Sequence, residues 1–117
     1  MNIDRNTVRE FQLASVGNTV GERILRIGTS APGKITKVRV TDIKAVCAGT
    51  ARTFKVMVRG GYTHKPLNFT LQANSTHNFT FEVPYTFNIV ASSGVDYSLV
   101  ASASGAGVDY VVCGYTE

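Results

Sequence analysis

Apolar and polar residues alternate with a period of two along most of this chain, and helical spacing is scarce. Such alternation places every second side chain on the same face of a β-strand. Turn-forming pairs such as Pro32-Gly33 and Gly60-Gly61 separate the alternating segments. The predicted strands are residues 11–16, 22–28, 34–48, 52–59, 67–72, 78–83, 85–91, 95–101 and 108–115. This pattern predicts an all-β, antiparallel β-sandwich that is jelly-roll-like, because the spacing leaves no room for the crossover helices of a parallel sheet.

The first twenty residues are the hardest part of the chain to assign. Thr7 and Glu10 have the spacing of a capping box before Phe11, which would begin a short helix. The alternative is an extended N-terminal arm, which would pack on a neighbouring subunit or partner rather than on its own domain. A chain of 117 residues suits a single domain. We therefore expect an N-terminal arm or short helix over residues 1–20 and one β-sandwich domain over residues 21–117.

The long predicted strand at residues 34–48 changes phase once. Its inward-facing residues are Val38, Val40, Ile43, Ala45 and Cys47. Inward residues of a regular strand are two positions apart, but Val40 and Ile43 are three apart, with Thr41 and Asp42 between them. A β-bulge would produce this slip, because it inserts one extra residue into a strand.

Residues 34–59 are predicted to form a hairpin whose outer face is basic. With a turn at residues 48–51, Ala45 would lie opposite Phe54 and Lys44 opposite Lys55. One interpretation is an ordinary solvated face that is partly neutralised by Asp42. The other is a docking surface for a negatively charged partner. The basic residues that this register would place on one face are Lys37, Arg39, Lys44, Lys55 and Arg59.

The second half of the chain has outer faces of amides and hydroxyls instead. Phe79, Phe81 and Val83 form the predicted inward set of one strand there. The last strand is apolar on both sides, with Val111, Cys113 and Tyr115 facing away from its other apolar set. A strand of this kind is either central in the sandwich or covered by another subunit.

The charge of the chain is divided unevenly along its length. All 12 Lys and Arg lie at or before residue 65, whereas the 8 acids are split four and four, so the two parts carry formal charges of +8 and −4 within the total of +4. This distribution indicates an anionic partner. Nucleic acid is not the expected one, because the basic face lacks the interleaved exposed aromatics that stack on bases.

The sequence offers no constellation of residues for catalysis. His64 and His77 fall in predicted loops, and no cluster of His, Cys and carboxylates has metal-ligand spacing. Cys47 and Cys113 lie in strand-like runs and are expected to be reduced thiols in the core. We therefore expect no enzymatic activity, no metal and no cofactor. The polar N-terminus does not look like a signal peptide and no run is long enough to span a membrane, so synthesis in a cytoplasm is expected.

Several segments resemble small β-sandwich virion proteins of tailed bacteriophages. A Pro-Gly-Lys turn precedes the first long strand of that group, and a Val-rich strand followed by Gly and an acidic terminus closes the chain. The matching segments lie within roughly residues 22–117 and are residues 31–40 (APGKITKVRV), 53–58 (TFKVMV), 88–93 (NIVASS) and 108–115 (VDYVVCGY). The N-terminal extension and the one-sided charge depart from the group.

The resemblance implies a capsid decoration or cement protein, trimeric and located on the virion surface. Its partner would be the major capsid protein. The residues predicted to face the capsid are Arg23, Arg26, Lys37, Arg39, Lys44, Lys55 and Arg59, and those predicted for the contact between subunits are Val111, Cys113 and Tyr115. The alternatives are a carbohydrate- or receptor-binding module of a tail or fibre, and a small head–tail connector.

Overall fold

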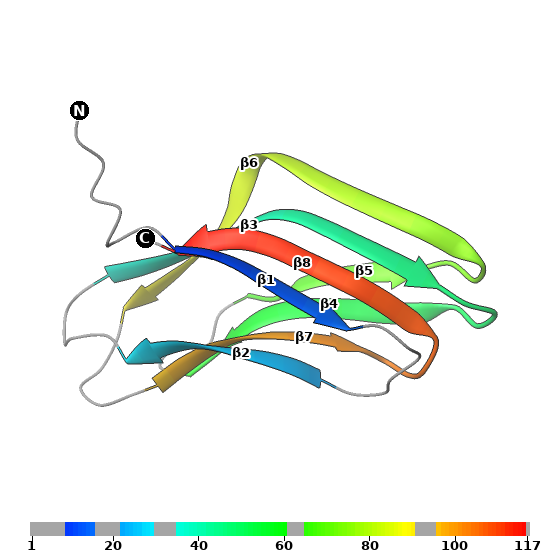
Figure 1. The fold of residues 1–117 in the computed structure, drawn as a ribbon, viewed down its shortest axis with the longest axis horizontal. Coiled ribbons are helices and arrows are strands. Elements are labelled where there is room, and N and C mark those ends of the chain that lie inside the picture. Colours follow the sequence, from blue (N-terminus) through cyan, green and yellow to red (C-terminus); the bar gives the residue numbers. More distant parts are fainter. Residues whose placement is uncertain (1–8, 16–21, 30–34, 61–64, 91–95, 117) are drawn as a thin grey trace.

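A computed structural model describes residues 9–15, 22–29, 35–60, 65–90 and 96–116. These residues form eight strands in two four-stranded antiparallel sheets that pack face to face (Figure 1). The first sheet has the order β1 (Arg9–Ser15), β8 (Val108–Thr116), β3 (Ile35–Cys47) and β6 (Ser75–Val90). The second has the order β2 (Glu22–Thr29), β7 (Asp96–Ala103), β4 (Arg52–Arg59) and β5 (Leu67–Leu71). The predicted all-β antiparallel sandwich is confirmed.

The strand pairing is that of a jelly roll. The chain pairs β1 with β8, β2 with β7, β3 with β6 and β4 with β5, as if one long antiparallel hairpin had been wrapped into two layers. Two further pairings, β3 with β8 and β4 with β7, join the wrapped ribbon into its sheets. Each wrap places sequence-distant strands side by side, so the sandwich depends on long-range contacts.

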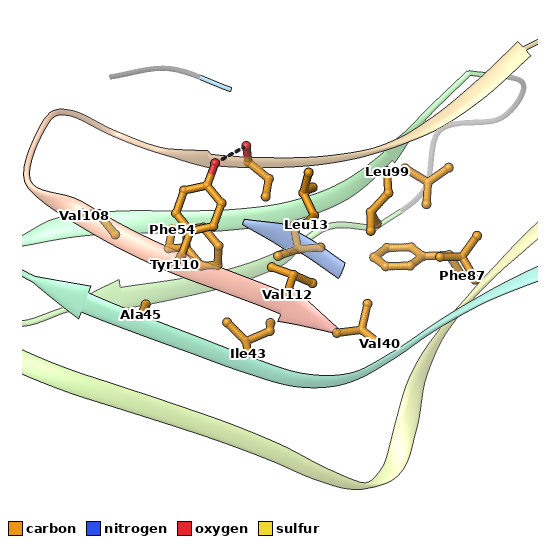
Figure 2. Packing of buried hydrophobic residues seen from close by; sticks show 14 of the residues in the cluster. Leu13, Val40, Ile43, Ala45, Phe54, Phe87, Leu99, Val108, Tyr110 and Val112 are labelled. Carbon is orange, nitrogen blue, oxygen red and sulfur yellow. Dashed lines mark hydrogen bonds between the residues drawn. The ribbon is translucent and has the colours of Figure 1, made fainter. Parts of the chain in front are cut away.

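The core consists of the alternate residues that face between the sheets. The inward residues predicted for β3, from Val38 to Cys47, are buried as expected, and Phe54, Val56 and Val58 of β4 are buried as well. Figure 2 shows Val40 and Ile43 of the first sheet on the same side of their strand as Phe54 and Leu99 of the second, so that the two sets share the space between the sheets. Phe54 is the largest fully buried side chain, and its ring lies 4.7 Å from that of Tyr110. Burying a side chain of this size stabilises the fold by about 1.5–3 kcal/mol.

The predicted β-bulge in β3 is present. Val40 lies opposite Gly114 and Asp42 opposite Cys113, which leaves Thr41 as the extra residue. The Thr41 hydroxyl donates to the carbonyl oxygen of Cys113 at 3.2 Å. The bulge keeps the apolar residues on both sides of it directed into the core, as the phase change in the sequence indicated.

The predicted N-terminal arm is partly wrong, because residues 9–15 form β1 and pair along their whole length with β8. Leu13 and Ser15 are buried by this pairing. The sandwich therefore includes residues that we had placed outside it, and no described residue of the expected arm is helical. The remaining residues of the expected arm that precede β2, 1–8 and 16–20, lie outside the described part of the chain.

The two strands predicted at residues 78–83 and 85–91 are a single strand, β6, which bends in the middle (Figure 1). Asp42 of β3 lies opposite Thr80 and Val40 opposite Tyr85, so residues 81–84 of β6 face only Thr41. We call residues 81–84 the β6 arch. Pro84 is tolerated in it because β6 is an edge strand, where its missing N–H removes no ladder bond.

Candidate assembly surfaces

The basic residues predicted for one outer face lie on two opposite faces. The predicted hairpin pairing of Lys44 with Lys55 is wrong, because β3 and β4 belong to different sheets. Lys44 lies between Val111 and Asn78, and Lys55 lies between Asn68 and Ser102. The turn at residues 48–51 crosses from one sheet to the other, since the apolar sides of both strands can then face each other across the core.

The outer face of the first sheet carries Lys37, Arg39 and Lys44. Lys44 is exposed, whereas Lys37 and Arg39 are half-buried. Arg39 donates from Nη1 to the hydroxyl oxygen of Thr86 at 3.2 Å, directly beside the β6 arch. Its contact holds β3 and β6 together where the ladder resumes, so Arg39 has an internal structural role in addition to its charge.

The outer face of the second sheet carries Lys55 and Arg59, and Arg59 is engaged in an ion pair. Its Nη2 lies 2.7 Å from Oε1 of Glu22 on β2. The hydrogen bond with Arg59 lowers the pKa of Glu22 below its ordinary value, with a smaller contribution from the charge of Lys55, and the same bond raises the pKa of Arg59. Arg59 is therefore partly neutralised within its own chain.

The ion pair spans an apolar residue that the sequence analysis did not identify. Glu22 lies opposite Ser102 and Arg59 opposite Ser98 on β7, so Val100 lies midway under the pair. Val100 is fully buried (0% exposed) although it faces away from the core. Ile24 and Met57 flank it in register. Three consecutive apolar residues at 99–101 are the sequence signal for a strand that is covered on both faces.

Arg23 and Arg26 lie on β2, at one lateral edge of the sandwich. Both are exposed, and between them on the same strand Ile24 is 55% exposed. Arg26 lines a shallow cavity of about 160 Å³ between β1 and β2, together with Glu10. The structure therefore distributes the seven predicted capsid-facing residues over two faces and one edge.

The residues predicted for the contact between subunits lie on β8, which is central in its sheet. Of the two interpretations offered for this strand, the structure shows the central position. Val111, Cys113 and Tyr115 are half-buried on the outer face. Cys113 and Tyr115 line an open hollow of about 570 Å³ beside β1. Burial raises the pKa of the Cys113 thiol, to which the charge of Asp42 adds.

Both cysteines are free, and only one is fully buried. Cys47 lies in the core and its Sγ donates to the carbonyl oxygen of Thr50 at 3.2 Å. Cys113 is half-buried on the outer face of the first sheet. No disulfide joins them in this structure, and the expectation that both lie in the core holds for Cys47 alone.

The other lateral edge, between β5 and β6, is aromatic. Phe69 of β5 stacks on Phe79 of β6 with ring centroids 4.3 Å apart. His77 stacks on Phe79 at 6.1 Å, and its Nε2 accepts a hydrogen bond from the backbone N–H of Gln72 at 3.2 Å. Val83, which we predicted to face inward, is 80% exposed. It lies in the β6 arch, where the alternation of the strand is interrupted.

Chemistry for catalysis or metal binding is sparse in the described part of the chain. No group of three or more His, Cys, Asp or Glu residues there is placed to hold a metal ion. His64 lies outside the described residues. Those residues also contain no helix of the length and apolarity that crossing a bilayer requires.

No protein-family model matches this chain, and no match was found among curated proteins or among solved structures.

Proposed function

We propose that this chain is a non-enzymatic structural protein of a virion, a decoration or cement protein that binds the outer surface of a capsid as a small homo-oligomer. The observation that carries the proposal is the exposure of large aliphatic side chains at three separate places. They are Ile24 at 55%, Val46 at 41% and Val83 at 80%. Ile24 lies across Val100 from Met57 on the outer face of the second sheet, and an apolar patch with polar residues around it is typical of a surface that another protein covers.

The fold and the resemblance support the same proposal. Jelly rolls of eight strands are common among viral coat proteins, although the fold alone assigns no function. The similarity of residues 31–40 and 108–115 to phage virion proteins favours the capsid over other assemblies. A trimer is the expected oligomer, since the resemblance implies it.

Basic side chains would orient the protein on an acidic capsid surface, and buried apolar area would supply most of the affinity. The division of those side chains between two faces changes the expected docking. Only one face can contact the capsid at a time. The outer face of the second sheet offers Lys55 beside the Arg59–Glu22 pair, and the outer face of the first offers Lys37 and Lys44.

The test is cosedimentation of the purified chain with heads assembled from the major capsid protein encoded in the same genome. Two charge-reversal variants are compared, Lys37→Glu with Lys44→Glu on the first sheet and Arg26→Glu with Lys55→Glu on the second. Binding at low salt should be saturable for the wild type and lost in one of the two variants. Unchanged binding in both would refute the charge contribution, and absence of wild-type binding would refute the proposed function.

A carbohydrate-binding module is less well supported. Sugar platforms expose coplanar aromatic faces, whereas the rings of Phe69 and Phe79 are stacked on each other with 25° between their planes. Tyr85 and Tyr115 are half-buried. A specific hit on a glycan array would reverse this preference.

A further inference from the structure

We infer that the outer edge of β1 is a binding site for an extended segment of a partner protein, which adds to the first sheet as a further strand. The inference rests on the proposed function only for the identity of that partner, the capsid protein. β1 ends its strand order and pairs with β8 alone among the described strands. In an antiparallel ladder, every second residue directs its N–H and C=O away from the partner strand. An extended chain can bond to those groups at the edge of β1.

β1 lacks the features that prevent pairing at the other three edge strands of the described sheets. The ladder of β2 shifts register between Arg26 and Gly28, β5 has only five residues, and β6 contains the β6 arch with Pro84. β1 pairs over seven residues without a shift, and its sequence, REFQLAS, contains no proline, glycine or lysine. Bulges, prolines, lysines and short strands are the usual protection of an exposed edge. The edge of β1 is therefore the one most open to a further strand.

An apolar cavity lies beside this edge. β1 and β2 are the end strands of their sheets on the same side of the sandwich, and the cavity between them has a volume of about 160 Å³. Its apolar lining consists of Phe11, Leu25 and Ile27, which are partly buried and pack against the core. A strand added to β1 directs every second side chain towards the second sheet, so one aliphatic side chain can enter the cavity. The backbone of the segment would give affinity, and this side chain would give specificity.

The β1 strand of a second copy does not fit this site. If β1 paired with β1 across a two-fold axis, the inward residues of the added strand would again be Phe11, Leu13 and Ser15. Leu13 and Ser15 are buried in their own sandwich, and Phe11 packs against the core of its own chain. None of the three can enter the cavity of the other copy. The occupant is therefore a segment outside any folded core, such as an extended loop or terminus of the partner.

The first experiment compares amide hydrogen exchange in the free chain and in the chain bound to heads assembled from the major capsid protein. Exchange in β1 should be fast in the free chain and slower by roughly tenfold or more in the bound chain. The control is β5, the edge strand on the other side of the second sheet, whose exchange should not change. Slow exchange of all β1 amides in the free chain would refute the inference, because the edge would already be paired. Unchanged exchange of β1 on binding would refute it as well.

The second experiment tests the site without assembled heads. Short overlapping peptides that cover the capsid protein are titrated against the chain by fluorescence anisotropy. At least one should bind, through an aliphatic residue whose replacement by Asp weakens binding by roughly tenfold. Ile27→Phe fills the cavity and should weaken binding of the same peptide by a similar factor, with an unchanged urea midpoint. Val46→Phe is the matched control, because Val46 is exposed on the outer face of the first sheet.

The outcomes separate the site from the proposed function. Equal binding of the peptide by wild type and Ile27→Phe would refute the role of the cavity, and Leu25→Phe replaces Ile27→Phe if that variant does not fold. Head binding without any peptide binding and without protection of β1 would refute the inference and leave the proposed function standing. Peptide binding that Ile27→Phe abolishes, without head binding, would leave the site standing and refute the proposed function.

Discussion

The two lateral edges of the sandwich join the same two sheets with different chemistry. At the β5–β6 edge, half-exposed aromatic rings stack between the sheets, with Phe69 and Phe79 4.3 Å apart. Near the β1–β2 edge, the neighbouring strands β8 and β7 are joined by a hydrogen bond between the sheets. The hydroxyl of Tyr110 on β8 donates to the carbonyl oxygen of Ala101 on β7 at 3.2 Å (Figure 2). Stacked rings tolerate small displacements, whereas a buried hydroxyl needs its acceptor in place.

The difference also concerns how closely the backbones approach. Near the β1–β2 edge, Gly114 lies where β3 bulges, and a Cβ there would overlap the carbonyl oxygen of Arg39 and lie 2.7 Å from the ring of Phe11. The described aromatic edge has no comparably tight glycine. Substitutions should therefore be most damaging at the β1–β2 edge when they add atoms, and at the β5–β6 edge when they remove them.

The largest effect is expected for Gly114→Ala. The methyl group meets backbone and an aromatic ring that cannot both move away, so the free energy of unfolding should fall by about 3 kcal/mol or more. Urea denaturation followed by circular dichroism measures this change. Gly49→Ala is the control, because a Cβ at Gly49 meets nothing within 4 Å. Equal stability of the two variants would contradict the close approach.

The next largest effect is expected for Phe69→Ala. It removes one ring of the stack at the β5–β6 edge, and because Phe69 is half-buried the cost should be about 2 kcal/mol, below that of a fully buried phenylalanine. The same urea titration applies. Val83→Ala, at the same edge but outside the stack, should change stability by less than about 0.5 kcal/mol. A similar loss in both variants would assign the effect to exposed surface and not to the stack.

Tyr110→Phe should cost about 1 kcal/mol at neutral pH, because the carbonyl oxygen of Ala101 loses its donor. Burial raises the pKa of Tyr110 above its ordinary value of 10.0, so the folded chain disfavours the phenolate. The wild type therefore loses this contribution as pH rises above 10.0 towards the folded pKa, and the two proteins should converge in stability.

Tyr85→Phe is the matched control for that substitution. The Tyr85 hydroxyl donates to the carbonyl oxygen of Lys65 at 3.3 Å in an exposed position, where water can replace it. Its effect should be smaller than that of Tyr110→Phe at neutral pH. A gap between wild type and Tyr110→Phe that persists unchanged at high pH would contradict the role of the buried hydroxyl.

The smallest effect is expected for Arg59→Ala, on the outer face between the two edges. It uncovers Val100 and frees Glu22, whose pKa the hydrogen bond with Arg59 lowers. Since the lowered pKa belongs to the folded chain, the pair stabilises it above 4.5, the ordinary glutamate value, and less as pH falls through the folded pKa. Urea midpoints of wild type and variant should differ slightly at neutral pH and converge in acid.

Lys55→Ala, on the same strand and face, should change the midpoint less than Arg59→Ala, because the charge of Lys55 lowers the pKa of Glu22 less than the hydrogen bond with Arg59 does. If Lys55→Ala had the larger effect, general charge on this face would matter more than the pair over Val100.

The local alternation of residues determined most of the strands and their inward sets. The period of two is a property of each strand alone, so residues such as Val38, Val40 and Ile43 are predicted to face inward from the sequence and are buried. The bulge at Thr41 was also predictable, because an extra residue shifts the phase within one strand. The sandwich class follows from these local features.

Pairing between strands was decided only by the tertiary structure. The alternation of apolar and polar residues predicts which face of β3 and of β4 is apolar. It does not predict whether the two strands pair side by side in one sheet or, as observed, lie in different sheets. For the same reason the ion pair of Arg59 with Glu22, the outward turn of Val83 and the place of residues 9–15 beside β8 were not foreseen. They depend on contacts between residues far apart in the chain, and a local period carries no information about those contacts.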